Sequence, residues 1–138
     1  MPRMGLTAER VTLAGAELAD RVGFDAVTVS AVAEGFGVKV ASLYSHVRGS
    51  QDLRTRIALL ALAEMADLAS AAVAGRAGKD ALVALADVYR DYAREHPGRY
   101  AAAQLRLDHA TALASAGPRH AAMSRAVLRV SCLLLRLS

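Results

Sequence analysis

The chain has 138 residues and a formal net charge of +4, with 54% hydrophobic and 22% charged residues. This balance excludes a disordered chain and fits one domain, or one small domain with a helical extension. Ala accounts for 31 residues and Trp is absent, and because Ala is the best helix former, the composition predicts an all-α protein.

Charge, cysteine content and hydropathy indicate the cellular compartment of the protein. Residues 36–56 carry a net +3 whereas residues 1–35 carry −2, so the basic excess begins in one short segment. A single cysteine, Cys132, excludes an internal disulfide framework and fits a reducing compartment. The most apolar run, 127–137, is interrupted by two arginines and is shorter than the ~20 residues that span a bilayer. We therefore expect a cytoplasmic protein that makes no membrane contact.

Two helices are predicted in the first part of the chain. Thr7 is the expected N-cap of the first and Gly23 its stop. Thr28 is the N-cap of the second, which ends at the glycines of residues 35–37. The apolar faces at helical spacing are Val11, Ala14, Leu18 and Val22 in the first helix, and Val29, Val32, Ala33 and Phe36 in the second.

A third apolar stripe follows almost at once. It consists of Val40, Leu43, Tyr44 and Val47 and ends at Arg48-Gly49. Two short helices of about two turns each, joined by a turn of about three or four residues that contains Gly, match the helix-turn-helix layout. The second of them is the expected recognition helix.

The rest of the chain predicts longer helices. Ser50 is expected to cap one that runs to about Ala74, and Asp80 one that His96-Pro97-Gly98 closes. Two more are expected over 99–114 and from Pro118 to the end. The natural boundary lies at 48–50, which divides the chain into residues 1–49 and residues 50–138.

The segment 28–53 has the properties of a unit that binds a DNA duplex, with its second helix in the major groove. Lys39 and Ser42 suit base edges or phosphates, and Val40 and Ala41 offer methyl groups to thymine. The remaining candidates suit phosphate oxygens or a close approach of the backbone. The full set of predicted DNA-binding residues is Thr28, Lys39, Val40, Ala41, Ser42, Tyr44, Ser45, His46, Arg48 and Ser50.

Residues 7–56 closely resemble the DNA-binding domain of the TetR/AcrR family of bacterial transcriptional regulators. The resemblance rests on Gly23-Phe24-Asp25-Ala26-Val27-Thr28-Val29, on Val32-Ala33-Glu34, on Gly37-Val38 and above all on Ser42-Leu43-Tyr44-Ser45-His46-Val47. It implies an N-terminal three-helix DNA-binding unit and a helical C-terminal domain that binds a small effector and dimerises. A weaker match to the C-terminal domain of one TetR subgroup covers Tyr89 and His96-Pro97-Gly98-Arg99-Tyr100.

Three departures from the family pattern stand out. Lys39 replaces the small polar residue that usually caps the recognition helix, and Ser50 stands where a phosphate-binding lysine is common. The chain also stops at Ser138 inside an apolar segment where the family continues. The resemblance therefore implies a shortened C-terminal domain whose dimer interface is incomplete or covered by a partner.

The C-terminal part contains candidates for an effector site, because ligand pockets are mostly apolar with a few polar groups. They are Met65, Tyr89, Tyr92, His96, Tyr100 and Met123. Aromatic and Met side chains at helical spacing are equally typical of plain core. No catalytic residues, no metal-ligand spacing and no cofactor motif are found, so we do not expect an enzyme.

The leading hypothesis is a transcriptional repressor that binds a palindromic operator as a homodimer and is released by a small-molecule effector. The alternative is a helical module that binds a small molecule or another protein and has lost or weakened its DNA binding. A small helical enzyme that depends on His96 or His109 is the third and least favoured hypothesis.

Overall fold

The computed structural model describes residues 5–105, and every regular element in that range is helical. The elements are α1 (Ala8–Val22), the 3-10 helix η1 (Phe24–Ala26), α2 (Val29–Phe36), α3 (Val40–Leu43), α4 (Ser50–Val73), α5 (Gly78–Glu95) and α6 (Pro97–Ala103). The all-α prediction is confirmed. The helix predicted over 99–114 is shorter in the structure, because α6 ends at Ala103. The predicted helix from Pro118 lies outside the described residues, as do Met123 and Cys132.

Helix α1 has the ends that its sequence predicts. Thr7 Oγ1 accepts a hydrogen bond from the Arg10 backbone N–H at 3.1 Å, and Gly23 ends the helix with a φ of +96°. The predicted apolar face is wrong at Val22, which is 56% exposed. The buried residues Val11, Gly15 and Ala19 lie four apart on one side of the helix. Val22 is on the same side by helical spacing, but it is the last residue of α1.

Helices α2 and α3 form the expected pair, but α3 is shorter than predicted. Thr28 Oγ1 accepts from the Ala31 N–H at 3.1 Å, and Gly37 ends α2 in the left-handed conformation with a φ of +66°. Regular α-helix ends at Leu43 instead of reaching Arg48. The carbonyl of Leu43 accepts from the N–H groups of both His46 and Val47, at 2.9 and 3.0 Å. This turn buries Leu43 and Val47 although the helix has stopped.

Two helix starts differ from the sequence predictions. Ser50 is the first residue of α4 and its side chain makes no cap for that helix; Gly49 holds the N-cap position. Helix α5 starts at Gly78 rather than after Asp80, which lies in its first turn. An acidic side chain is favourable there because the N-terminal end of a helix carries partial positive charge. Pro97 occupies the first position of α6, as its missing N–H allows.

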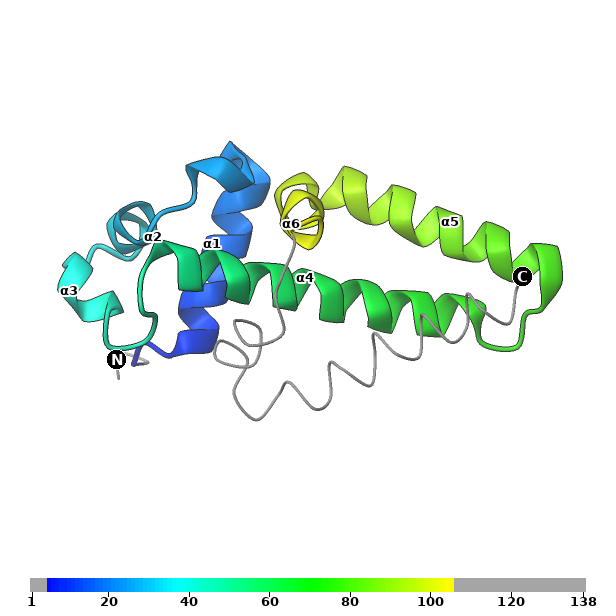
Figure 1. Cartoon of the computed structure of the whole chain (residues 1–138), viewed down its shortest axis with the longest axis horizontal. Helices are drawn as coiled ribbons and strands as arrows, with labels where there is room; N and C mark the ends of the chain where they lie inside the picture. Colours follow the sequence, from blue (N-terminus) through cyan, green and yellow to red (C-terminus); the bar gives the residue numbers. More distant parts are fainter. Residues whose placement is uncertain (1–4, 106–138) are drawn as a thin grey trace.

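Helix α4 extends along the length of the described structure and connects its two ends (Figure 1). At one end α1, α2 and α3 gather around its first turns, and toward the other end α5 packs beside it. The largest buried cluster combines Val11, Val32 and Leu43 with Leu53 and Ile57 of α4. The core of the N-terminal unit therefore includes the first turns of α4 and continues past the predicted boundary at residues 48–50.

Helix α6 lies between α1 and α5 and packs on α4 as well (Figure 1). Its Ala102 is fully buried and belongs to the same core cluster as α1 and α4. Tyr100 and Ala103 pack on a separate buried cluster formed by Ala61, Met65 and Tyr92. Within residues 5–105, no helix is long and apolar enough to cross a membrane.

Candidate nucleic-acid interface

The predicted DNA-binding residues gather on α3 and the segments that flank it, at one end of the described structure (Figure 1). Most of them are exposed and three are half-buried. The exposed residues are Thr28, Lys39, Ala41, Ser42, Tyr44, Ser45 and Arg48, and the half-buried ones are Val40, His46 and Ser50. The exposed side chains at this end of the structure thus include hydroxyl groups, a lysine and an arginine.

Tyr44 and Val40 differ from the predicted apolar stripe of the recognition helix. Tyr44 is 55% exposed and Val40 only half-buried, whereas Leu43 and Val47 are fully buried. Helix α3 is a single turn; its Leu43 and, beyond its end, Val47 are in the core, and Val40 packs against the same core cluster. The Tyr44 ring therefore belongs to the exposed surface rather than to the core.

The hydroxyl groups of Thr28 and Ser50 both cap α2. Thr28 accepts from the Ala31 N–H, and Ser50 Oγ accepts from the Val29 N–H at 3.0 Å. A hydroxyl group has one donor and two acceptor positions, so each O–H retains its hydrogen for another acceptor. Both side chains are consequently fixed in position with a donor left for a phosphate oxygen.

The basic residues after α3 are largely committed to the protein itself. Asp52 accepts from the Arg48 backbone N–H at 2.9 Å, lies 3.8 Å from the Arg48 guanidinium and pairs with Arg56 Nε at 3.0 Å. Arg54 donates to the backbone carbonyls of Asp25 and Val27 and lies over the Phe24 ring. From the sequence, Asp52 counted only as one negative charge against these arginines and its ion pairs were not predicted, although the i,i+4 spacing of Asp52 and Arg56 was a visible signal.

The predicted effector residues within the described range also meet. Met65 and Tyr92 are buried together, with Tyr89 and Tyr100 packed against them. The His96 ring lies 5.2 Å from the Tyr92 ring, measured between centroids. Burial, and next the neighbouring Glu64 carboxylate, raise the pKa of the Tyr92 phenol. The group combines apolar side chains with the Tyr92 phenol and the His96 imidazole.

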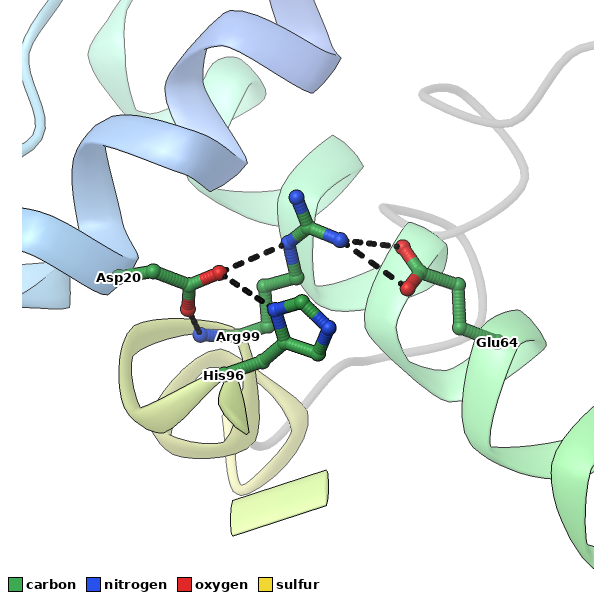
Figure 2. Close-up of polar contacts among 4 residues, drawn as sticks. All are labelled: Asp20, Glu64, His96 and Arg99. Atoms are coloured by element: carbon green, nitrogen blue, oxygen red, sulfur yellow. Dashed lines mark hydrogen bonds and ion pairs between the residues drawn. The ribbon is translucent and has the colours of Figure 1, made fainter. Parts of the chain in front are cut away.

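A network of charged side chains lies beside these residues (Figure 2). Arg99, 8% exposed, has its Nε 3.1 Å from Asp20 Oδ2, and its Nη1 donates to both Glu64 oxygens at 3.1 and 3.2 Å. His96 Nδ1 lies 2.9 Å from the same Asp20 oxygen. Sequence reasoning did not select Asp20, Glu64 or Arg99 as functional residues, and no local pattern joins positions so far apart in the chain. Among residues 5–105, no group of three or more His, Cys, Asp or Glu side chains is arranged to hold a metal ion.

Comparison with known proteins agrees with this geometry. Residues 12–56 match the family model described as bacterial regulatory proteins, tetR family. Residues 82–134 match the model described as tetracyclin repressor-like, C-terminal domain. The chain belongs to the TetR family.

Two relatives described as HTH-type transcriptional regulators match over most of the chain. The uncharacterized HTH-type transcriptional regulator YobS of Bacillus subtilis is 37% identical over 106 residues, which are 77% of this chain and 56% of the relative. The uncharacterized HTH-type transcriptional regulator Rv0681 of Mycobacterium tuberculosis is 37% identical over 97 residues, or 70% of this chain and 44% of the relative. The chain thus spans about half the length of the curated relatives it matches.

The two matched segments correspond to distinct parts of this TetR-family structure. The N-terminal match extends from α1 into the first turns of α4 and includes every predicted DNA-binding residue. It also crosses residues 48–50, as the buried core does. The C-terminal match begins in α5 and contains Tyr89, Tyr92, His96 and Tyr100, but not Met65.

Proposed function

We propose that this chain is a transcriptional repressor that binds a palindromic operator as a homodimer and releases it when a small-molecule effector binds. The exposed surface of α3 carries the proposal. Ser42 and Lys39 offer donors for base edges or phosphates, and the exposed Tyr44 ring offers a hydroxyl group to the backbone of the duplex. The protein would act in the cytoplasm, where such an operator is found.

The two predicted parts of the chain have different roles in this proposal. Residues 1–49 supply the surface that contacts DNA, and residues 50–138 supply regulation and dimerisation. The first turns of α4 belong to both, because their core side chains pack on α1. In a dimer, the two recognition helices need a separation of about 34 Å to enter successive major grooves on one side of the duplex.

The effector site proposed here is the group of Met65, Tyr89, Tyr92, His96 and Tyr100, with Met123 as a further candidate. The support for it is the contact between the apolar cluster and the His96 ring. An effector lowers DNA affinity only if it binds more tightly to a helix arrangement that fits the operator poorly.

Titration with DNA across salt concentrations tests the proposal. The probe is the duplex that the protein selects from a randomised pool, and specific binding should weaken as salt rises. Lys39→Ala should weaken binding. Loss of a phosphate contact reduces the salt slope by about one, whereas loss of a base contact relaxes specificity at one base pair. Lys79→Ala is the matched control: this lysine is also exposed but lies in the first turn of α5, far along α4 from α3.

Tyr44→Ala separates DNA contact from folding. The side chain is 55% exposed, so its removal should lower DNA affinity and leave thermal stability nearly unchanged. A folded protein that selects no duplex at any salt concentration overturns the DNA-binding proposal. The same protein binding a small apolar ligand with Tyr92 would then support the alternative of a ligand-binding module.

A further inference from the structure

Helix α6 is capped by a side chain that comes from another helix. The N-cap residue of α6 is His96, whose side chain makes no capping hydrogen bond. Instead Asp20, in the last turn of α1, accepts from the Arg99 backbone N–H through Oδ1 at 2.9 Å (Figure 2). The first turn of a helix leaves its N–H groups unpaired, and a carboxylate there is favourable in both hydrogen bonding and charge. The end of α1 thereby completes the start of α6.

The second oxygen of the same carboxylate faces two side chains of α6 and its cap. Asp20 Oδ2 lies 2.9 Å from His96 Nδ1 and 3.1 Å from Arg99 Nε. Arg99 then pairs with Glu64 of α4. Because the Arg99 side chain is only 10% exposed, loss of a partner leaves a charge poorly solvated. The network therefore joins α1, α4 and α6 through one buried guanidinium.

The backbones of α1 and α6 touch at the same place. A Cβ atom added to Gly98 would lie 2.0 Å from both the carbonyl carbon and the oxygen of Ala19 and 2.5 Å from the Asp20 nitrogen. Only a residue without a side chain allows this approach. The backbones of α1 and α6 are in direct contact here. A movement of α6 must therefore either move the end of α1 with it or break the hydrogen bond between Asp20 and the Arg99 N–H.

The capped contact lies between the proposed effector group and the DNA-binding unit. On one side, His96 packs against Tyr92 of the effector group. On the other, α1 shares its core with α2 and α3 through Val11, Val32 and Leu43. Tyr92 is thus connected to α1 by its ring contact with His96 and by the hydrogen bond between His96 and the Asp20 carboxylate.

We propose that Asp20 is a positioning residue that fixes the helix-turn-helix unit on α6 and transmits a displacement of His96 to α1. The inference rests on the proposed function and adds to it the group through which the two parts of the chain are coupled. Displacement of His96 and Arg99 removes the partners of Asp20 and releases the end of α1. The helix-turn-helix unit then loses its fixed orientation relative to α6.

The test compares Asp20→Asn with Glu64→Gln. Both variants remove one negative charge and one partner of Arg99, but only Asp20→Asn weakens the link between α1 and α6. Affinity for the duplex selected by the wild-type protein should fall about tenfold in Asp20→Asn, as expected for loss of hydrogen bonds to a charged group. It should change less than about twofold in Glu64→Gln. The salt slope should stay unchanged in both, because no phosphate contact is altered.

Two readouts separate positioning from general destabilisation. Affinity is expressed per folded molecule, so partial unfolding does not lower it. Hydrogen exchange of the Arg99 amide and of the amides in α2 and α3 should be faster in Asp20→Asn than in the wild-type protein. In Glu64→Gln the same amides should exchange more slowly than in Asp20→Asn. Asp20→Asn binding DNA as tightly as the wild-type protein overturns the coupling, and so does unchanged exchange in α2 and α3.

A measurement on the unmodified protein covers the case in which Asp20→Asn does not fold. Coupling between two sites is reciprocal, so binding of the selected duplex should slow exchange of the Arg99 amide about tenfold, the factor expected for the variant. An unchanged rate overturns the proposal. A wild-type protein that selects no duplex refutes the proposed function instead. Where Asp20→Asn folds, its exchange comparison with Glu64→Gln still decides whether Asp20 links α1 and α6.

Discussion

The hydroxyl oxygen of Ser50 accepts a hydrogen bond from the backbone N–H of Val29 at 3.0 Å. Val29 is the first residue of α2 and Ser50 the first residue of α4, so the bond connects the starts of two helices that are 21 residues apart. Thr28 caps the same end of α2 through the Ala31 N–H. Two hydroxyl groups together satisfy N–H groups that the helix itself leaves unpaired.

Ser50→Ala should lower the free energy of unfolding by about 1 kcal/mol, the usual cost of losing a side-chain cap. Urea denaturation measures the loss. Ser70→Ala is the control, since Ser70 is exposed on α4 and its replacement should cost less than about 0.5 kcal/mol. Equal effects of the two substitutions would show that the bond to Val29 contributes nothing.

Asp52→Asn should change stability and DNA binding in opposite directions. The Asp52 side chain is 8% exposed and binds the Arg48 N–H as well as the Arg56 guanidinium. Loss of its charge weakens these charge-assisted bonds and should cost about 1–2 kcal/mol in urea denaturation. The local positive charge is then no longer offset, so affinity for duplex DNA at low salt should rise.

Asp67→Asn provides the control for charge alone. Asp67 lies on the same helix in an exposed position, so its replacement changes the net charge equally but should leave stability within about 0.5 kcal/mol. Weaker DNA binding by Asp52→Asn, in step with its lost stability, would mean that Asp52 only supports the turn before α4.

The parts of the fold that the sequence predicted are those that depend on neighbouring residues. Thr7 and Thr28 cap the helices that follow them, and Gly23 and Gly37 end theirs with positive φ. These features follow from groups within four residues of each other. The order of the helices and the position of the helix-turn-helix unit were predictable for the same reason.

The features that the sequence did not predict join distant positions. Ser50 was expected to cap its own helix, but its hydroxyl group accepts from the N–H of Val29 instead. The bond between Asp20 and Arg99 spans 79 residues, and only the packing of α6 on α1 brings the two together. Tyr44 was placed on the apolar stripe of a two-turn helix with its hydroxyl group outward, whereas α3 has one turn and Tyr44 is 55% exposed.

Gly98→Ala should destabilise the chain more than its helical position suggests. Alanine normally stabilises a helix relative to glycine by up to about 1 kcal/mol. Here the added Cβ would meet the Ala19 backbone at 2.0 Å, and relief of that overlap should cost about 2–3 kcal/mol in chemical denaturation. Gly35→Ala is the matched control, because Gly35 lies in α2 with no neighbouring atom within 4 Å of the added Cβ. It should be neutral or stabilising; a neutral Gly98→Ala would contradict the close contact of α1 and α6.

The buried phenol of Tyr92 makes the stability of the chain depend on alkaline pH. Burial above all raises its pKa from the ordinary value of 10.0, so above pH 10 the unfolded chain releases this proton while the folded chain keeps it. The unfolded state then binds fewer protons, and the free energy of unfolding must fall as pH rises, by up to about 1.4 kcal/mol per pH unit. Below pH 10 the contribution is constant.

Tyr92→Phe should remove this part of the pH dependence, because phenylalanine has no proton to release. Urea denaturation from pH 9 upward measures it as the difference in slope between the variant and the wild-type chain. Tyr44→Phe removes a hydroxyl group from a ring that is 55% exposed and should leave the contribution of Tyr92 in place. Identical slopes for Tyr92→Phe and the wild-type chain would mean that the phenol ionises as readily in the folded state as in the unfolded one. The hydroxyl group would then be accessible to solvent, contrary to the 2% exposure of Tyr92.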